Sequence, residues 1–413
     1  MQSVLILGRQ PKLGLAELES LYGSAKIRRA GTSAAVVDID PCLLAFDRLG
    51  GSVKFCKVLA ELDTTQWKEI EKFLLTAAPD HAKQMPEGKM HLGLSLYDFK
   101  ESVRHIEATG LTLKKAIRKT GRSVRLVPNK EAALSSAQVL HNRLTSTHGW
   151  ELVFIRDNGK TIIAQTVNIQ DIDSYTIRDR SRPKRDARVG MLPPKLAQII
   201  INLAAGELPE DKLKSICDIP EGGIVTRPHL QQTILDPFCG TGVVLQESAL
   251  MGYDVYGTDL EPRMVEYTKT NLVWLNSTYK LEGSYDFRFA NADATIAQWE
   301  LPIDFIACET YLGRPFTVRP TAEVLAQTVA DCNLILKRFL QNIHGQIQSG
   351  TRLCLAVPAW HMSTTEFKHL PLIDQIQDLG YNRTSFEHVG AESLLYYRED
   401  QIVARELLVI TRK

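Results

Sequence analysis

The segment best suited to bind a ligand runs from Asp236 to Gly242 and reads Asp-Pro-Phe-Cys-Gly-Thr-Gly. An apolar run at Thr233–Leu235 precedes it and predicts a strand, and the residues over 242–251 predict a helix. Glycines in such a loop let the backbone approach a ligand at the start of the helix, where open amide groups favour anionic groups. Because this junction is the usual binding crevice of an open α/β sheet, we predict a ligand site there.

Two acids follow at the ends of the next two predicted strands. Asp259 comes seventeen residues after Gly242, where its carboxylate can bind two ribose hydroxyls. Asp293, within 291–294, can accept a hydrogen bond from an adenine amino group. Strand ends of a parallel sheet meet at one edge, so the loop and the two acids predict one adenosine pocket. A simpler role for both acids, as ordinary caps of strand ends, stays open.

A nicotinamide-binding loop is the main rival interpretation of this segment. Its fingerprint requires a third glycine, but Leu245 stands at that position. The Asp-Pro-Phe lead-in is also foreign to that fingerprint, so the sequence disfavours a dehydrogenase.

The elements that must position these residues alternate strand and helix over the last 180 residues, which is typical of a doubly wound parallel sheet. A final hairpin over 394–397 and 403–411 is predicted to close the sheet edge. The predicted parallel strands are Thr233–Leu235, Asp254–Gly257, Phe287–Ala290, Phe305–Cys308 and Arg352–Val357.

The N-terminal half alternates shorter elements and predicts an α+β region. Its first 60 residues resemble a small α+β module, followed by an amphipathic helix over Thr65–Ala78. Thr112 is predicted to cap a basic helix that ends at Gly121. A hairpin is predicted over 151–169, across Asp157-Asn158-Gly159.

The composition is that of a globular protein: 413 residues, enough for two or three domains, are 44% hydrophobic and 23% charged. No apolar run approaches the roughly 20 residues of a membrane span, and no signal peptide is evident, so we expect a cytoplasmic protein. The seven cysteines contain no CxxC pair, so neither a disulfide framework nor a metal site is predicted.

Charge indicates a nucleic-acid partner only through its local distribution, because the net charge is +1. The run 113–125 contains no acid, and the run 178–188 is rich in arginine. Each could be an ordinary solvated face. Two such runs outside the predicted catalytic core favour a phosphate-contacting surface.

At this point the sequence resembles a known family. Asp-Pro-Phe-Cys-Gly-Thr-Gly is similar to the cofactor loop of amino-directed methyltransferases. Arg178-Asp179-x-x-Arg182-Pro183, followed by Gly190-Met191-Leu192-Pro193-Pro194-Lys195-Leu196-Ala197, resembles the tRNA guanine-10 N2-methyltransferases of archaea and eukaryotes. The resemblance is strong over 176–310 and weaker over 1–170.

The resemblance implies three domains: a ferredoxin-like module over 1–62, a THUMP-like RNA-binding domain over 63–175, and a methyltransferase domain over 176–413. The last would be a Rossmann-like class I fold with a seven-stranded, mostly parallel sheet and S-adenosylmethionine as cofactor. A tRNA or another structured RNA is the implied partner, and a small activator subunit stays open. The implied cofactor-binding residues are Pro193, Asp236, Pro237, Phe238, Cys239, Gly240, Gly242, Asp259, Leu260, Asp293 and Ala294. The implied nucleic-acid-binding residues are Lys114, Lys115, Arg118, Lys119, Arg122, Arg178 and Arg182.

One motif departs from the family. Its members carry Asp/Asn-Pro-Pro-Tyr after the fourth strand, whereas this chain has Glu309-Thr310-Tyr311-Leu312-Gly313. We expect Glu309 to accept a hydrogen bond from the target amine and Tyr311 to stack on the base. The rigid diproline that would position the amine is absent. A role for Glu309 as a plain strand-end acid stays open.

The leading hypothesis is therefore transfer of a methyl group to guanine N2 in tRNA, at position 10 by resemblance. A DNA methyltransferase acting on adenine N6 or cytosine N4 is a second hypothesis, because the same loop serves that chemistry. A non-catalytic RNA-binding protein that retains the fold is a third, motivated by the replaced tetrapeptide.

Overall fold

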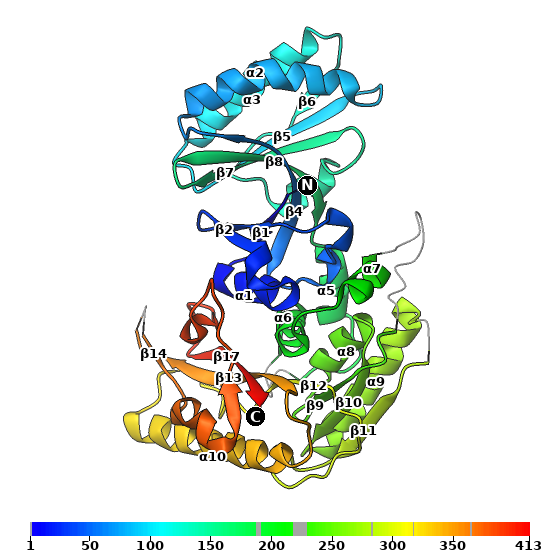
Figure 1. Cartoon of the computed structure of the whole chain (residues 1–413), viewed down its shortest axis with the longest axis vertical. Helices are drawn as coiled ribbons and strands as arrows, with labels where there is room; N and C mark the ends of the chain where they lie inside the picture. Colours follow the sequence, from blue (N-terminus) through cyan, green and yellow to red (C-terminus); the bar gives the residue numbers. More distant parts are fainter. Residues whose placement is uncertain (1, 187–190, 218–228, 282–283, 317, 364–365) are drawn as a thin grey trace. The chain divides into compact units, whose positions relative to one another are not determined.

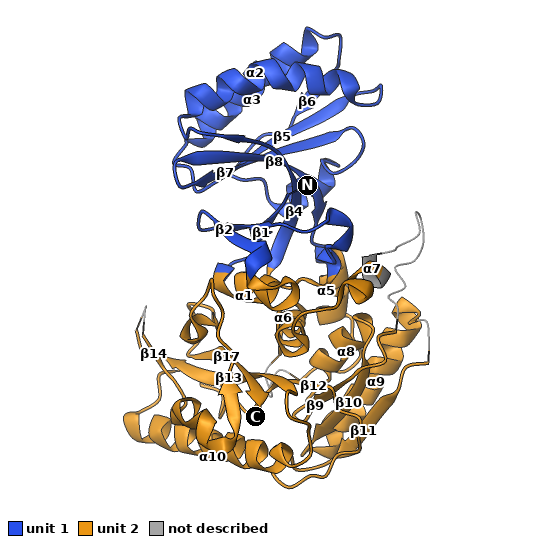
Figure 2. Cartoon of the chain, in the orientation of Figure 1, with its two compact units in different colours: residues 1–11, 25–47, 52–172 blue, residues 12–24, 48–51, 173–413 orange. Residues whose placement is uncertain are grey.

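The computed structural model describes residues 2–186, 191–217, 229–281, 284–316, 318–363 and 366–413. The chain forms two compact units (Figure 2). Unit 1 comprises Met1–Pro11, Ala25–Asp47 and Ser52–Ile172, and unit 2 comprises Lys12–Ser24, Arg48–Gly51 and Asp173–Lys413. The predicted boundary at 175/176 lies close to the last of these transitions.

Unit 1 is built on one eight-stranded sheet in the order β2-β3-β1-β4-β8-β7-β5-β6. The long strand β4 pairs with β1 on one side and with β8 on the other, so the modules predicted over 1–62 and 63–175 share a single sheet. The strands are β1 (Ser3–Leu7), β2 (Ile27–Ala30), β3 (Ala34–Val37), β4 (Ser52–Leu62), β5 (Met90–Tyr97), β6 (Val124–Leu126), β7 (Gly149–Asp157) and β8 (Lys160–Ile169).

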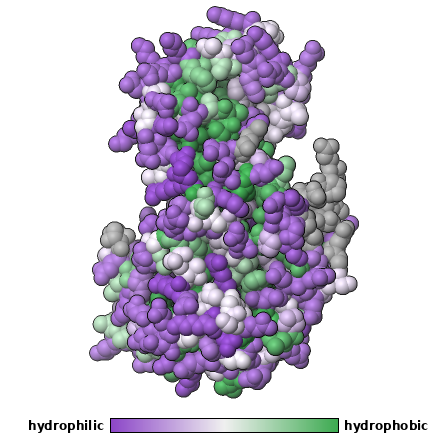
Figure 3. All heavy atoms as spheres, in the orientation of Figure 1, coloured by the Kyte–Doolittle hydropathy of each residue, from purple (hydrophilic) through white to green (hydrophobic). Residues whose placement is uncertain are grey.

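Helices α2 (Trp67–Gln84) and α3 (Val103–Arg118) cover one part of this sheet (Figure 1). Their apolar side chains pack with those of β5 and β7 in one core. The short helix α4 (Ser136–His141) begins with a capping box at Ser135. On the face shown in Figure 3, the outer surface of α2 and α3 is mostly hydrophilic.

Two local predictions for unit 1 have different outcomes. The hairpin β7–β8 is confirmed, and Asn158 and Gly159 both have positive φ, as a tight turn of this kind requires. The predicted start of the basic helix at Thr112 is wrong. Helix α3 begins after Ser102, whose side chain accepts a hydrogen bond from the backbone N–H of His105 at 3.2 Å.

Unit 2 contains a mostly parallel sheet in the order β11-β10-β9-β12-β13-β17-β15, with β14 and β16 beside it. The predicted Rossmann-like arrangement is confirmed, and β17 with β16 forms the predicted antiparallel hairpin. The strands are β9 (Thr233–Asp236), β10 (Asp254–Asp259), β11 (Phe287–Asn291), β12 (Phe305–Glu309), β13 (Arg352–His361), β14 (Phe367–Lys368), β15 (Tyr381–Arg383), β16 (Leu395–Tyr396) and β17 (Val403–Arg412).

Helices lie on both faces of this sheet (Figure 1). None of the helices within the described residues is long and apolar enough to cross a membrane. The helices of unit 2 are α1 (Pro11–Tyr22), α5 (Ile172–Arg180), α6 (Pro194–Ala205), α7 (Glu210–Cys217), α8 (Val243–Leu250), α9 (Pro262–Tyr279) and α10 (Ala322–His344).

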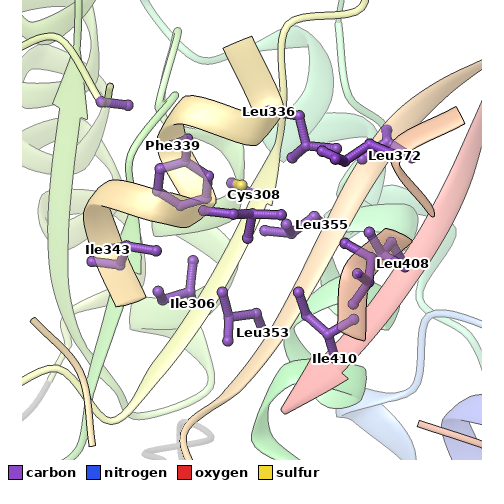
Figure 4. Packing of buried hydrophobic residues seen from close by; sticks show 14 of the residues in the cluster. Ile306, Cys308, Leu336, Phe339, Ile343, Leu353, Leu355, Leu372, Leu408 and Ile410 are labelled. Carbon is purple, nitrogen blue, oxygen red and sulfur yellow. The ribbon is translucent and has the colours of Figure 1, made fainter. Parts of the chain in front are cut away.

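The alternation of side chains along the strands decides which residues face which layer. Ile306, Cys308, Leu353 and Leu355 pack against α10 around Phe339 (Figure 4). Successive side chains of a strand point to opposite faces. Glu309 therefore lies on the opposite face, where α6 contacts β12, β13 and β17.

Helix α1 contributes a buried carboxylate to unit 2. Glu17 accepts hydrogen bonds from the backbone N–H groups of Gly50 and Gly51, at 2.9 and 2.8 Å, and from the side chain of Asn202 at 2.7 Å. Burial, only partly offset by these hydrogen bonds, raises the pKa of Glu17 from 4.5 to about 7. The N-terminal segment thus places an ionisable group inside the C-terminal unit.

Glu17 should make the stability of unit 2 depend on pH. Its pKa is higher in the folded state than in the unfolded chain, so the folded state binds more protons between about pH 4.5 and 7. The free energy of unfolding should therefore fall by about 3 kcal/mol across this range. Urea unfolding of wild type and Glu17→Gln at several pH values tests this. The variant should lack that part of the slope, and an unchanged slope would contradict the assignment.

Candidate active site

The carboxyl ends of the parallel strands bring the predicted acids to one edge of the sheet. Strand β9 ends at Asp236, β10 at Asp259 and β12 at Glu309. Asp236 pairs in register with Gly257, and Asp259 pairs with Asn291. Leu235 and Tyr256 pack toward α10. Asp236 is one residue after Leu235 and Asp259 is three residues after Tyr256, so both acids lie on the same face as Glu309.

The loop after β9 is held in a shape that leaves Gly240 open on one side. Gly240 and Gly242 have φ of +51° and +81°. The N–H of Gly240 donates to Asp259 Oδ2 at 2.9 Å, and Thr268 Oγ1 donates to the carbonyl of Gly240 at 2.9 Å. A Cβ at Gly242 would lie 2.9 Å from Thr268, whereas one at Gly240 would meet no atom nearer than 4.0 Å. Only glycine suits both positions, and a ligand can approach the backbone at Gly240.

Asp259 keeps hydrogen-bonding capacity for a ligand. Its two oxygens each accept one backbone N–H, from Gly240 and from Glu261, both at 2.9 Å. A carboxylate oxygen has two acceptor sites, so one remains on each oxygen. Burial raises the pKa of Asp259. Beside it, the side chain of Leu260 is 68% exposed and offers an apolar surface to a ring.

Asp293 is partly committed to its own turn. Its Oδ1 accepts from the backbone N–H and the hydroxyl of Thr295, both at 2.8 Å. The capping role that the sequence left open is therefore present for this oxygen. Contact with an adenine amino group would fall to Oδ2.

Asp236 is the most strongly perturbed acid of the edge. It is buried, and its Oδ1 accepts the N–H of Phe238 at 3.1 Å. Burial raises the pKa of Asp236 well above its usual value, and the nearby carboxylates of Asp259 and Glu309 raise it further. A cationic ligand group would favour the ionised form.

The remaining predicted residues of the loop region face inward. Phe238 packs edge to face on Phe339, with ring centroids 5.3 Å apart. Cys239 and Ala294 are buried. Burial raises the pKa of the Cys239 thiol well above its usual value, which suits packing rather than nucleophilic chemistry. Helix α6 begins directly after Pro193.

Glu309 is ion-paired, which the sequence did not indicate. Arg405 of β17 donates its Nε–H to Glu309 Oε1, and the two side chains are 10% and 16% exposed. Arg405 lies 96 residues further along the chain. The signal available in the sequence was the charged pair Arg405-Glu406 within the otherwise mostly apolar segment Val403–Thr411.

Tyr311 lies close to α10. Its side chain is 43% exposed. Partial burial raises the pKa of Tyr311, and Cys332 and Asp331 of α10 are close enough to raise it further. The stacking role predicted for Tyr311 stays a prediction.

The residues predicted to bind nucleic acid divide into two groups. On α3 and just after it, Lys115, Arg118 and Lys119 are exposed and Lys114 is half-buried. Arg122 donates to the backbone carbonyls of Pro86 and Met85 at 2.6 and 2.7 Å, which ties it to the end of α2.

The prediction that Arg178 and Arg182 lie on a phosphate-contacting surface is wrong, because both are buried. Arg178 Nε donates to Glu247 Oε1 of α8 at 2.7 Å. The guanidinium of Arg182 has no hydrogen-bond partner among the described residues, and burial lowers the pKa of Arg182. A local run of arginines does not reveal an acid 69 residues away that draws one of them inside.

Arg178→Met should therefore destabilise the fold without weakening RNA binding. Breaking the buried ion pair of Arg178 with Glu247 by removing one partner costs about 3–5 kcal/mol. Urea unfolding measures this loss, and Arg178→Met/Glu247→Met should recover part of it. Reduced RNA affinity at unchanged stability would instead restore the surface role.

The C-terminal part of the chain is similar to a known protein domain. Residues 224–367 match the model of the RMKL-like methyltransferase domain. Over these residues the chain is similar to the RMKL-like methyltransferase domain. This match confirms two predictions from the sequence, a methyltransferase domain and S-adenosylmethionine as its cofactor.

The chain spans less than half of the length of the curated relatives described here. The chain is 29% identical over 170 residues to a tRNA (guanine(10)-N2)-dimethyltransferase of Methanothermobacter thermautotrophicus, which spans 41% of this chain and 39% of that protein. It is 25% identical over 197 residues to the enzyme of the same name from Pyrococcus abyssi, 47% of each chain. The crystal structure of TrmN from Thermus thermophilus aligns over 100% of both chains at 14% identity, with a TM-score of 0.48.

The described residues fit this cofactor. The open side of Gly240 admits a ligand against the backbone, and the spare acceptor sites of Asp259 suit a ribose. Buried Asp236 suits an ammonium group, because a cation would offset the cost of its ionisation. These acceptor groups therefore match a nucleoside joined to an amino acid.

Proposed function

We propose that the chain transfers a methyl group from S-adenosylmethionine to the exocyclic amine of a nucleic-acid base, guanine N2 in tRNA, at position 10. The observation that carries this proposal is the row of Asp259, Asp236 and Glu309 on one face of the sheet edge. The similarity to two tRNA (guanine(10)-N2)-dimethyltransferases supports the choice of base and of RNA.

When bound, S-adenosylmethionine supplies a methyl group that is electrophilic without further activation. The work left to the protein is binding and orientation. Asp259 would hold the ribose hydroxyls, and Asp236 the amino group. Asp293, Leu260 and Ala294 would surround the adenine, and the segment from Pro193 and the backbone of Pro237, Phe238, Cys239, Gly240 and Gly242 would complete the pocket.

Glu309 would act on the substrate side of this row. Its Oε2 can accept an N–H of the target amine, which would hold the nitrogen in place for transfer. The base must leave its stack to reach a site at the strand ends. Tyr311 would stack on the extruded base.

Unit 1 would grip the RNA. We assign it as the THUMP-like region implied by the sequence, with the exposed cations of α3 as phosphate contacts. A tRNA is the partner this requires, and an activator subunit is compatible with it. A competition assay tests the substrate class: unlabelled tRNA should suppress methyl transfer to labelled tRNA, and duplex DNA should not. Suppression by duplex DNA alone would favour the DNA hypothesis.

Lys115→Gln/Arg118→Gln should weaken tRNA binding in a salt-dependent manner. Each lost phosphate contact lowers the slope of log affinity against log salt by about 1. Filter binding at several salt concentrations measures the slope. The matched control is Lys337→Gln/Arg338→Gln, two exposed cations of α10. Equal effects of the two pairs would show a non-specific charge effect and remove α3 from the interface.

A further inference from the structure

The ion pair of Glu309 and Arg405 lies where a base would meet the catalytic edge. Arg405 faces Pro358 of β13 and Tyr396 of β16 in the antiparallel register. Leu408 and Ile410 of the same strand pack toward α10, so Arg405 points to the other face, together with Glu309 and Asp236. Arg405 is thus next to the row of acids and not part of the core.

This pair still has unused hydrogen-bonding capacity. A guanidinium carries five N–H donors, and among the residues that the structure describes Arg405 uses only its Nε–H, which it donates to Oε1 of Glu309. Within the described part of the chain, the terminal nitrogens of Arg405 have no hydrogen bond and are not among the fully enclosed atoms. Oε2 of Glu309 likewise has no hydrogen bond within the described part of the chain and is not among the fully enclosed atoms. The pair therefore presents a carboxylate acceptor directly beside guanidinium donors.

The ion pair also restricts the position of the Glu309 carboxylate, which the rigid diproline of the family motif would otherwise do. A carboxylate on a free glutamate would move among several side-chain conformations, and ordering it would cost entropy. The hydrogen bond from Arg405 fixes one oxygen, which restricts where the second oxygen can lie. Charge-assisted hydrogen bonds of this kind are among the stronger ones in proteins.

We propose that Arg405 is a base-reading residue: while Glu309 accepts from the target amine, Arg405 donates to an acceptor atom of the same base. This inference rests on the proposed function, because it assumes that an amino-bearing base enters the site. For guanine the acceptor would be ring N3 or O6. Uracil lacks the amine altogether, and hypoxanthine has both acceptors without the amine, so the pair should reject both.

The test measures binding rather than transfer. Nine-nucleotide RNAs with one variable base between two runs of four uridines are titrated by fluorescence anisotropy in the presence of S-adenosylhomocysteine. The variable base is guanine, hypoxanthine, 2-aminopurine (no O6) or 3-deazaguanine (no N3). Wild type should prefer guanine over hypoxanthine by about 10-fold. One of the last two bases should bind about 10-fold more weakly, which identifies the acceptor.

Variants separate base reading from a merely structural role. Arg405→Met should bind guanine no better than the base that lacks the acceptor, and Arg405→Lys, which keeps a cationic donor, should retain part of the difference. Arg383→Met is the matched control, because Arg383 pairs with Glu406 of β17 at 2.9 Å on the opposite face. It should lower stability and leave base preference unchanged.

Three results would overturn the proposal: no preference of wild type for guanine over hypoxanthine, a uniform loss of affinity for all four RNAs in Arg405→Met, or unchanged base preferences in Arg405→Met. Failure of the proposed function can be distinguished from failure of base reading. If wild type discriminates among the bases but methylates no RNA, base reading stands and the transfer assignment falls. If transfer is observed but Arg405→Met keeps the wild-type base preferences, the transfer assignment stands and base reading by Arg405 falls.

Discussion

Asp236→Asn is expected to weaken cofactor binding by about 100-fold and, at the same time, to stabilise the free protein. The loss of affinity follows because the amide cannot pair with the cofactor's ammonium group in a buried site, where truncating a charge pair costs several kcal/mol. The gain in stability follows because burial raises the pKa of Asp236, so ionising it costs folding free energy at neutral pH. Asparagine keeps the acceptor for the N–H of Phe238 without that cost.

The pH dependence of cofactor affinity provides a second, independent test of the role of Asp236. Below its raised pKa, Asp236 is protonated in the free protein, and a cationic ligand binds the ionised form better. Affinity for S-adenosylhomocysteine should therefore rise with pH in wild type and change less in Asp236→Asn. Calorimetry in buffers of different ionisation enthalpy should detect proton release only in wild type.

Asp254→Asn is the matched control for Asp236→Asn, at the opposite end of a neighbouring strand. Asp254 bonds to His229 at 2.8 Å and to the N–H of Asp286 at 2.7 Å. Its loss should lower stability and leave affinity unchanged. Unchanged cofactor affinity in Asp236→Asn would remove Asp236 from the pocket.

Glu309→Ala is expected to lower kcat by about 100-fold or more while cofactor affinity stays within experimental error of wild type. The physical reason is loss of the acceptor that positions the amine, for which a misplacement of about 1 Å can cost 100-fold. Single-turnover transfer to tRNA and calorimetry with S-adenosylhomocysteine measure the two quantities. The variant should also lose stability, because Arg405 would be left buried without its partner.

A second variant separates the chemical effect from the loss of stability. Glu406→Gln removes a different buried glutamate, on β17, which pairs with Arg383 and His369 on the other face of the sheet. It should destabilise the protein without a comparable loss in kcat. Equal losses of transfer and cofactor affinity in Glu309→Ala would place Glu309 in the cofactor pocket instead.

Much of unit 2 was predictable because its signals are local. Apolar strands followed by a glycine loop or an acid are readable within a few residues, and β9, β10 and β12 end at Asp236, Asp259 and Glu309. The parallel arrangement then follows from the alternation of strands and helices. The cofactor residues could be named for the same reason.

What could not be predicted depends on contacts between distant residues. The partner of Glu309 comes from the last strand, and the partner of Arg178 comes from α8. Both pairings are set by the order of strands and helices in space, which a local charge pattern does not contain. Helix α1 likewise joins unit 2 because Glu17 meets Asn202 and the backbone of Gly50 and Gly51.

The identity of the methylated nucleoside tests the proposed transfer to guanine N2. The protein is incubated with methyl-labelled S-adenosylmethionine and an unmodified tRNA transcript, and the labelled nucleoside is identified and located by mass spectrometry. We expect N2-methylguanosine at position 10, formed only when Glu309 is present. Label in another nucleoside, or no incorporation into any RNA while cofactor binding is intact, would contradict it.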